Sequence, residues 1–226
     1  MAKPVCVVIG IGPKNGASFA RRFSAEGYAV AMLSRTTELS SKLASELGDA
    51  KAYACDAGDA SSVESAFASV RTDLGEVDVL IYNAGSGSWG NIEQLSAADF
   101  EQSWRINTLG GFLAAKQVIP HMKEHGRGSI VFVGATASLR GKPFTTAFAP
   151  AKAAQRSLAQ AMARHLWPQG IHVSLLIIDG QIEKPGAGEI KTLDPDQIAD
   201  TAVYLTNQDR SAWTFELDLR PLKENW

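Results

Sequence analysis

The chain has 226 residues, of which 45% are hydrophobic and 20% are charged, as in a globular protein with one sizeable core. Its 22 basic and 24 acidic residues give a formal net charge of −2 without a run of like charge, so the composition indicates no nucleic-acid partner and no membrane partner. Two cysteines are too few for a disulfide framework, and no apolar stretch reaches the roughly 20 residues that cross a bilayer. Because no signal peptide precedes the first strand pattern, we expect a cytoplasmic protein.

Short apolar runs predict strands over residues 5–9, 29–33, 51–55, 77–82, 129–134, 171–178 and 214–219. Most are continuously apolar, which is typical of parallel strands covered by helices on both faces. Helices are predicted between them over residues 17–26, 37–47, 62–74, 96–122, 150–167 and 196–205. This alternation predicts a single Rossmann-type, doubly wound α/β domain over residues 1–226, with a mostly parallel seven-stranded sheet flanked by helices.

A glycine-rich loop joins the first strand to the first helix, with Gly10, Gly12 and Gly16 in the stretch Gly10-Ile11-Gly12-Pro13-Lys14-Asn15-Gly16. Glycine allows a tight turn and a close approach of the backbone to a pyrophosphate, while the helix N-terminus offers free N–H groups. Three glycines could instead serve only a strand–helix turn, but their position after the first strand favours a dinucleotide site.

The second strand pattern ends at Arg35, about twenty residues after the glycine loop, where NAD-binding proteins place a carboxylate on the ribose. An arginine there meets a 2′-phosphate instead, and Lys14 in the loop could meet the same phosphate. Either cation alone is as readily a solvated surface residue. Together they predict NADP(H) more strongly than NAD(H) as the cofactor.

Further candidate residues for cofactor binding or catalysis follow in order along the chain: Asp56, Asn83-Ala84-Gly85, Asn107, Lys152, Gly180 and Ile182. With the glycine loop, they resemble the short-chain dehydrogenase/reductase (SDR) family nearly end to end. The resemblance implies that Asp56 contacts adenine, that Asn83, Ala84 and Gly85 line the adenine-ribose side, and that Lys152 holds the nicotinamide ribose. It further implies that Asn107 holds a proton-relay water, that Gly180 and Ile182 lie at the carboxamide, and that Lys152 and Asn107 are catalytic.

The departures from the family pattern affect the chemistry most. The family's catalytic tyrosine lies four residues before the lysine, where this chain has Phe148, and its catalytic serine position is Ala135. Lys14, Tyr82 and Asp179 also replace a glycine, an asparagine and a proline of the family. A positioned acid contributes on the order of 10²–10⁴ in rate, so a standard carbonyl reductase is disfavoured.

Hydroxyl groups near the expected cleft are candidate substitutes, each of them also an ordinary loop hydroxyl. Thr136 is the first candidate, and the others are Ser138, Thr145, Thr146, Tyr82, Ser86 and Ser88. Trp89 and Phe144 lie in loops expected around the cleft. The four histidines show no metal spacing and are expected at the surface, so no metal site is predicted. The connection from Gly180 to Asp194 is short and contains glycine where the family usually places a longer, helical substrate lid, which predicts an open or weakly defined substrate site.

Three interpretations remain open, of which the weakest is a purely structural protein with an empty cleft. The first is an NADP(H)-dependent oxidoreductase that acts on a small carbonyl or alcohol substrate with atypical proton delivery. The second is a catalytically inactive NADP(H)-binding sensor or partner subunit. The resemblance also implies a homodimer or homotetramer, paired through the long helix and the Ala-rich helix, in which Ala153, Ala154, Ala159 and Ala163 would allow close approach. An Ala-rich face packed on its own sheet is the alternative.

Overall fold

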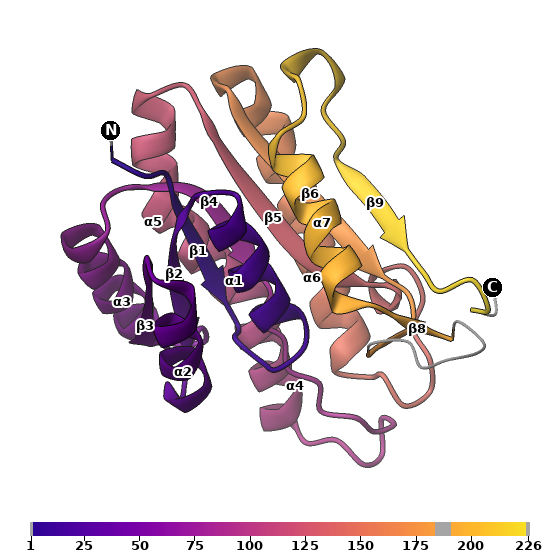
Figure 1. The fold of residues 1–226 in the computed structure, drawn as a ribbon. Coiled ribbons are helices and arrows are strands. Elements are labelled where there is room, and N and C mark those ends of the chain that lie inside the picture. Colours follow the sequence, from indigo (N-terminus) through magenta and orange to yellow (C-terminus); the bar gives the residue numbers. More distant parts are fainter. Residues whose placement is uncertain (1, 184–190, 225–226) are drawn as a thin grey trace.

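The computed structural model describes residues 2–183 and 191–224, and its centre is a seven-stranded parallel sheet (Figure 1). The strand order is β3-β2-β1-β4-β5-β6-β9. Successive strands are added on one side of β1 up to β3, and on its other side from β4 onward, so the order of addition reverses between β1 and β4. Ligands of such sheets bind at the carboxyl ends of the strands at this reversal. The strands are β1 (Val5–Ile9), β2 (Ala29–Ser34), β3 (Ala50–Ala54), β4 (Val77–Tyr82), β5 (Gly128–Ala135), β6 (Ile171–Ile178) and β9 (Glu216–Leu219).

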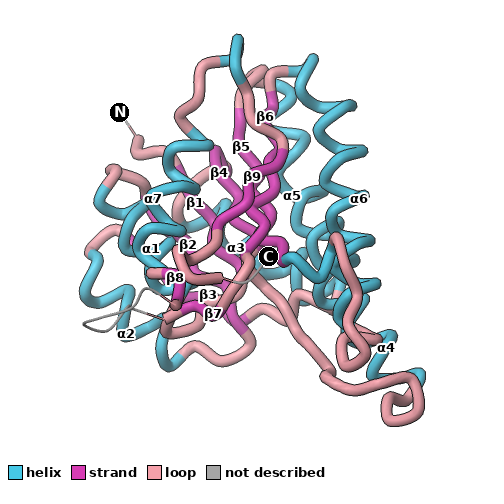
Figure 2. The backbone as a smooth tube through the Cα atoms, turned by 90° about the vertical axis from the view of Figure 1, so that its right-hand side faces the viewer, coloured by secondary structure: helices cyan, strands magenta, loops and turns pink. Residues whose placement is uncertain are grey.

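Helices cover both faces of the sheet, so that the fold has three layers (Figure 2). One face packs against α1 (Asn15–Ala25), α2 (Glu38–Leu47) and α7 (Pro195–Thr206). The other packs against α3 (Ala60–Asp73), α5 (Gly110–Glu124) and α6 (Phe148–Leu166). Phe19 and Phe23 fill the first layer of the core, while Phe67 and Phe132 fill the second. The continuous apolar strands are explained by this double covering.

The predicted sheet is confirmed, and the element bounds differ by a few residues. The predicted helix over 96–122 is a helix α4 (Ala97–Trp104), one π-helical turn (Arg105–Leu109) and α5, in succession. Ser96 and Asp99 form the capping box at its start. Helix α6 begins at Phe148, two residues before its predicted start. A two-stranded pair, β7 (Gln181–Ile182) with β8 (Thr192–Leu193), was not predicted.

The histidine prediction is wrong for His172, which is buried at the start of β6. Its ring stacks on Trp213 with centroids 4.8 Å apart, and its two nitrogens lie 3.0 and 2.8 Å from the carbonyl oxygens of Leu205 and Thr214. Polar backbone partners explain how an imidazole is accommodated in the core. His172 therefore has a structural role at the sheet edge opposite the carboxyl ends of the strands.

His121 and His125 also differ from expectation, because their i, i+4 spacing on α5 brings their ring nitrogens and a Glu124 oxygen within 4.8 Å of one another. This group lies at the C-terminus of α5, away from the carboxyl edge of the sheet. In the Ala-rich helix α6, Ala159 and Ala163 pack against the molecule's own sheet, so the alternative interpretation holds for them. No helix among the described residues is long and apolar enough to span a membrane.

Candidate active site

The glycine loop after β1 is shaped by two close backbone approaches. Gly10 has φ +94°, and a Cβ added there would lie 2.6 Å from Ala84 Cα. A Cβ added at Gly16 would lie 2.7 Å from Ile11 Cα. Both positions therefore exclude any larger residue, and the loop holds the N-terminus of α1 at the ends of β1 and β4.

The same loop borders a cavity of about 840 Å³, which we call the dinucleotide groove. A Cβ added at Gly12 would meet no atom of the described residues within 4 Å, so the open side of the loop faces the groove. In the described part of the chain, no side chain caps the start of α1, and the buried Oδ1 of Asn15 has no hydrogen-bond partner. Uncapped N–H groups and close backbone access are what a phosphate group needs. The groove thus fits a dinucleotide.

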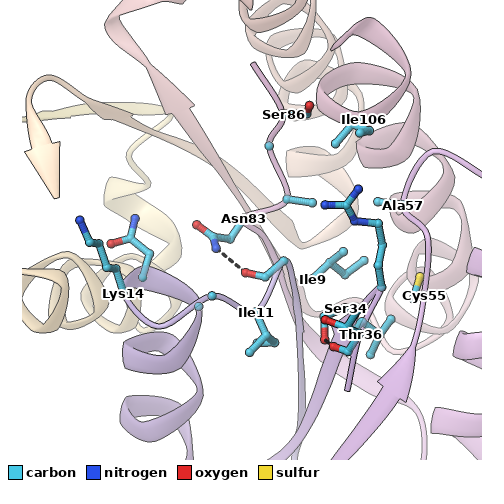
Figure 3. Close-up of a pocket in the computed structure, with 18 of the residues that line it drawn as sticks. Ile9, Ile11, Lys14, Ser34, Thr36, Cys55, Ala57, Asn83, Ser86 and Ile106 are labelled. Carbon is cyan, nitrogen blue, oxygen red and sulfur yellow. Dashed lines mark hydrogen bonds between the residues drawn. The ribbon is translucent and has the colours of Figure 1, made fainter. Parts of the chain in front are cut away.

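The predicted cofactor residues line this groove, from Gly10, Gly12, Lys14, Asn15 and Gly16 to Arg35, Asp56, Asn83, Ala84, Gly85 and Ile182. Asn83 Nδ2 donates a 2.7 Å hydrogen bond to the carbonyl oxygen of Gly10, which joins the end of β4 to the loop (Figure 3). Arg35 is exposed and makes no ion pair within residues 2–183 and 191–224. Asp56 Oδ1 accepts a hydrogen bond from its own turn, at the Gly58 N–H.

Lys14 and Arg35 line the dinucleotide groove from different elements, the loop after β1 and the end of β2. Lys14 lies on one side of Ile11 and Asn83, whereas Ser34 and Thr36, the neighbours of Arg35, lie on the other (Figure 3). Lys14 also borders a separate hollow with Arg21, Glu183 and Asp196 that lies between α1 and α7. That both cations meet one phosphate stays a prediction, and Arg35 is the one that directly follows the end of β2.

A second cavity of about 1020 Å³, which we call the substrate cleft, continues from the groove. Asn15, Asn83, Gly85, Ser86 and Ile182 line both cavities, so the two are adjacent. The cleft walls come from the ends of β5 and β6, the start of α6 and the loops before α4 and α6. Its lining includes Lys152, Phe148, Ala135, Thr136 and Gly180.

Lys152 lies in the buried wall of the cleft, and its ammonium group donates hydrogen bonds to Val133 O (2.9 Å) and Gln155 Oε1 (3.1 Å). The Phe148 ring, one turn earlier on α6, lies 5.8 Å from the Lys152 nitrogen. Burial lowers the pKa of Lys152 to about 7, because a low-dielectric surrounding disfavours the charged form. This amine can therefore exchange a proton near neutral pH.

Asn107 lies within the π-helical turn, and its Nδ2 donates hydrogen bonds to Ser86 O (2.7 Å) and Ser103 O (2.8 Å). These bonds fix the side chain, while the buried Oδ1 has no partner among the described residues. A Cβ added at Gly85 would lie 3.4 Å from that Oδ1 and 3.8 Å from Lys152 Nζ. Gly85 thus lies between two polar groups, and the orphaned oxygen is suited to accept a hydrogen bond from water.

The candidate hydroxyls differ in what they can do. Thr136 lines the cleft, but its hydroxyl donates to Ile178 O at 3.2 Å. The prediction for Tyr82 is wrong, because its ring is buried against Phe132 and its hydroxyl donates to Ile106 O. The Thr145 hydroxyl is hydrogen-bonded within the turn that begins at Lys142. Thr136 remains the candidate among them that both faces the cleft and lies beside Ala135.

Asp179, in place of the family's proline, is buried between two arginines. Its Oδ2 lies 2.9 Å from Arg220 Nη1 and 3.6 Å from Arg140 Nη2. Gly180 follows with φ +141°, packed against Pro221, and leads into β7, where Ile182 lies between the two cavities. The connection from Gly180 to Asp194 includes the β7–β8 pair, and its residues 184–190 lie outside the described part.

Sequence reasoning did not identify three features of the site: Gln155, the Arg140–Asp179–Arg220 group and the π-helical turn. Gln155 lies three residues after Lys152, and i, i+3 side chains are neighbours on a helix, so this spacing could have identified it. Asp179 and the two arginines are far apart in sequence, and no short-range pattern joins them.

The fold and the groove define a nucleotide-binding protein of the Rossmann type. The chain matches the family model described as short chain dehydrogenase over residues 4–185, and it belongs to this family of oxidoreductases with nicotinamide cofactors. It is 31% identical to sorbitol-6-phosphate 2-dehydrogenase of Escherichia coli over 189 residues, which cover 80% of this chain and 73% of that protein.

Two solved structures extend the comparison to the fold. A short-chain dehydrogenase from Rhodopseudomonas palustris is 34% identical, with a TM-score of 0.87 over 96% of this chain and 98% of that one. An alcohol dehydrogenase from the archaeon Thermococcus sibiricus complexed with 5-hydroxy-NADP is 27% identical, with a TM-score of 0.89 over 98% of each chain.

Proposed function

We propose that this protein is an NADP(H)-dependent oxidoreductase that transfers hydride between the cofactor and a small carbonyl or alcohol substrate. The observation that carries the proposal is the continuity of the dinucleotide groove with a cleft whose wall holds Lys152. When bound, the nicotinamide supplies or accepts the hydride. The chain's own residues bind, orient and exchange the proton.

The preference for NADP(H) over NAD(H) rests on Arg35. It occupies the end of β2, where a carboxylate would accept the ribose hydroxyls of NAD. A guanidinium pairs with a 2′-phosphate through two parallel hydrogen bonds.

Lys152 is the proton donor that this cleft supports best. The Phe148 ring cannot donate a proton, and Thr136 would first have to release its bond to Ile178 O. In carbonyl reduction, the carbonyl carbon gains the hydride and the oxygen gains a proton from the Lys152 ammonium, directly or through a water on Asn107 Oδ1. Solvent then recharges the amine.

Isothermal titration calorimetry with both cofactors tests the proposal, with NADPH oxidation followed over a panel of carbonyl compounds and quinones. We expect Arg35→Gln to weaken NADP(H) binding at least about tenfold and to leave NAD(H) binding unchanged. Lys42→Gln is the matched control, since Lys42 is exposed on α2 and lines neither cavity. Absence of heat with either cofactor would reject the assignment.

A non-catalytic cofactor sensor or partner subunit is the second candidate. It is favoured by Phe148 and Ala135, which occupy the cleft at the positions of both missing hydroxyl groups. Tight NADP(H) binding without turnover of any tested substrate would support this function. Turnover that is lost in Lys152→Ala would exclude it.

A further inference from the structure

Three aromatic rings form one wall of the substrate cleft, which we call the aromatic wall: Trp89, Phe144 and Phe148. The Trp89 ring centroid lies 5.1 Å from that of Phe148 and 6.3 Å from that of Phe144. Trp89 and Phe144 are 61% and 53% exposed. The Trp89 ring is tilted by 39° against Phe148 and by 41° against Phe144, and the exposed faces of Trp89 and Phe144 offer an apolar surface on which a planar ligand can pack.

The aromatic wall is held in place by the backbone. Trp89 lies in the loop before α4 and Phe144 in the loop before α6, and these loops are joined at Gly90. The Gly90 N–H donates to Phe144 O at 3.0 Å, and the Thr146 N–H donates to Gly90 O at 3.4 Å. The third ring, Phe148, is fixed in the first turn of α6. The wall is thus preorganised, which lowers the entropic cost of binding.

Two cationic side chains, Arg140 and Lys142, lie in the cleft lining near the aromatic wall. Asp179 pairs with Arg220 at 2.9 Å and with Arg140 at 3.6 Å, and Arg220 also pairs with Asp218, so the charge of Arg140 is compensated only in part. Lys142, beside Phe144, makes no ion pair in the described ranges. An anionic group is therefore attracted to the edge of the aromatic wall.

We propose that the substrate is a planar, conjugated carbonyl compound that bears a carboxylate or a similar anionic group. Its ring lies on the aromatic wall, its anion meets Lys142 and Arg140, and its carbonyl points toward Lys152. The inference rests on the proposed function. In the reduction, the carbonyl carbon takes the hydride from the reduced nicotinamide and the oxygen takes the proton from Lys152, which gives an alcohol and the oxidised cofactor.

Three matched probes separate the two recognition elements: 4-carboxybenzaldehyde, its methyl ester, and 4-formylcyclohexanecarboxylate. Saturation-transfer NMR measures binding of each, and NADPH absorbance measures turnover. We expect 4-carboxybenzaldehyde to bind about tenfold more tightly than either of the other probes, as a charge-assisted hydrogen bond or an aromatic contact implies. The advantage over the ester decreases with added salt, because exposed charges are screened.

Variants assign the effects to residues. We expect Lys142→Gln to lower the affinity for 4-carboxybenzaldehyde about tenfold and to leave the affinity for the ester unchanged. Trp89→Leu removes most of the preference for the aromatic acid over the cyclohexane acid. The matched controls are Lys42→Gln on α2 and Tyr204→Leu on α7, which are exposed and line neither cavity. Both controls keep the wild-type preferences.

Equal binding of the acid and its ester by the wild type, or an unchanged preference in Lys142→Gln, overturns the inference even if NADPH is bound and other carbonyl compounds are reduced. If NADPH does not bind but the acid binds with the same dependence on Lys142 and Trp89, the substrate-site inference stands. In that case the proposed redox function fails. The two failures are therefore distinguishable.

Discussion

Lys152 is a buried amine whose hydrogen bonds go to two neutral oxygens, so burial rather than a countercharge sets its ionisation. If it supplies the proton, carbonyl reduction requires the ammonium form and alcohol oxidation requires the amine. The rate of reduction should therefore fall as pH rises through about 7, and the rate of oxidation should rise over the same range. Steady-state pH profiles of kcat in both directions measure this. Profiles that are flat between pH 6 and 8 would contradict the role.

The same ionisation has a signature in stability that does not depend on turnover. Because the pKa of Lys152 is lower in the folded state than in the unfolded chain, the unfolded chain binds more protons between pH about 7 and about 10.4. Wild-type stability should rise with pH across this window, and Lys152→Met should remove that rise. Denaturant unfolding of both proteins from pH 6.5 to 10 measures this difference, with Lys152→Met as the control.

Phe148 and Ala135 offer a direct test of the missing hydroxyls. Phe148→Tyr combined with Ala135→Ser places a phenol one helical turn from Lys152 and should raise carbonyl reduction by about 10²–10⁴. Phe144→Tyr is the matched control, since it adds a phenol to the same cleft on a loop rather than on the helix that carries Lys152. An increase in the control alone, or in neither protein, would contradict the prediction that a phenol at position 148 supplies an acid beside Lys152.

In the loop between β1 and α1, we expect one glycine to be needed for stability and another for cofactor binding. Gly10→Ala should cost about 1–3 kcal/mol of stability, because a positive φ and contact with Ala84 both oppose a side chain. Gly12→Ala should leave stability unchanged or slightly raised and still weaken NADP(H) binding, since its added methyl group enters the groove. Thermal unfolding and calorimetry on both variants test this. Unchanged cofactor affinity in Gly12→Ala would indicate that the loop does not contact the ligand.

Local patterns explain which elements were predictable. The continuous apolar runs of β1, β2 and β6 follow directly from burial on two faces, and the capping box at Ser96 marks a helix start from four residues. The glycine loop was also identified correctly, because its geometry is determined within seven residues. These features depend on near neighbours in the chain, which a sequence displays.

The missed features depend on partners that are distant in sequence. Tyr82 carries a hydroxyl group near the expected cleft. Its side chain lies on a buried side of β4, however, where the hydroxyl donates a hydrogen bond to Ile106 O. His172 appears polar, but Leu205 and Thr214 supply its partners from more than thirty residues away. Lys14 borders a hollow that Glu183 and Asp196 complete from a distant part of the chain. None of these placements is determined by local periodicity.

At the scale of the whole molecule, α4 and α5 carry three exposed aromatic side chains on one continuous stretch: Phe100, Trp104 and Phe112. A second copy of the chain would bury them, and this supports the expected homodimer or homotetramer. We expect the wild type to sediment as an oligomer and Trp104→Glu with Phe112→Glu to sediment as a smaller species, because a carboxylate in such an interface is costly. Tyr204→Glu on α7, across the sheet, is the matched control. A smaller species with Tyr204→Glu alone would place the interface on α7 and contradict the pairing of the α4–α5 surface.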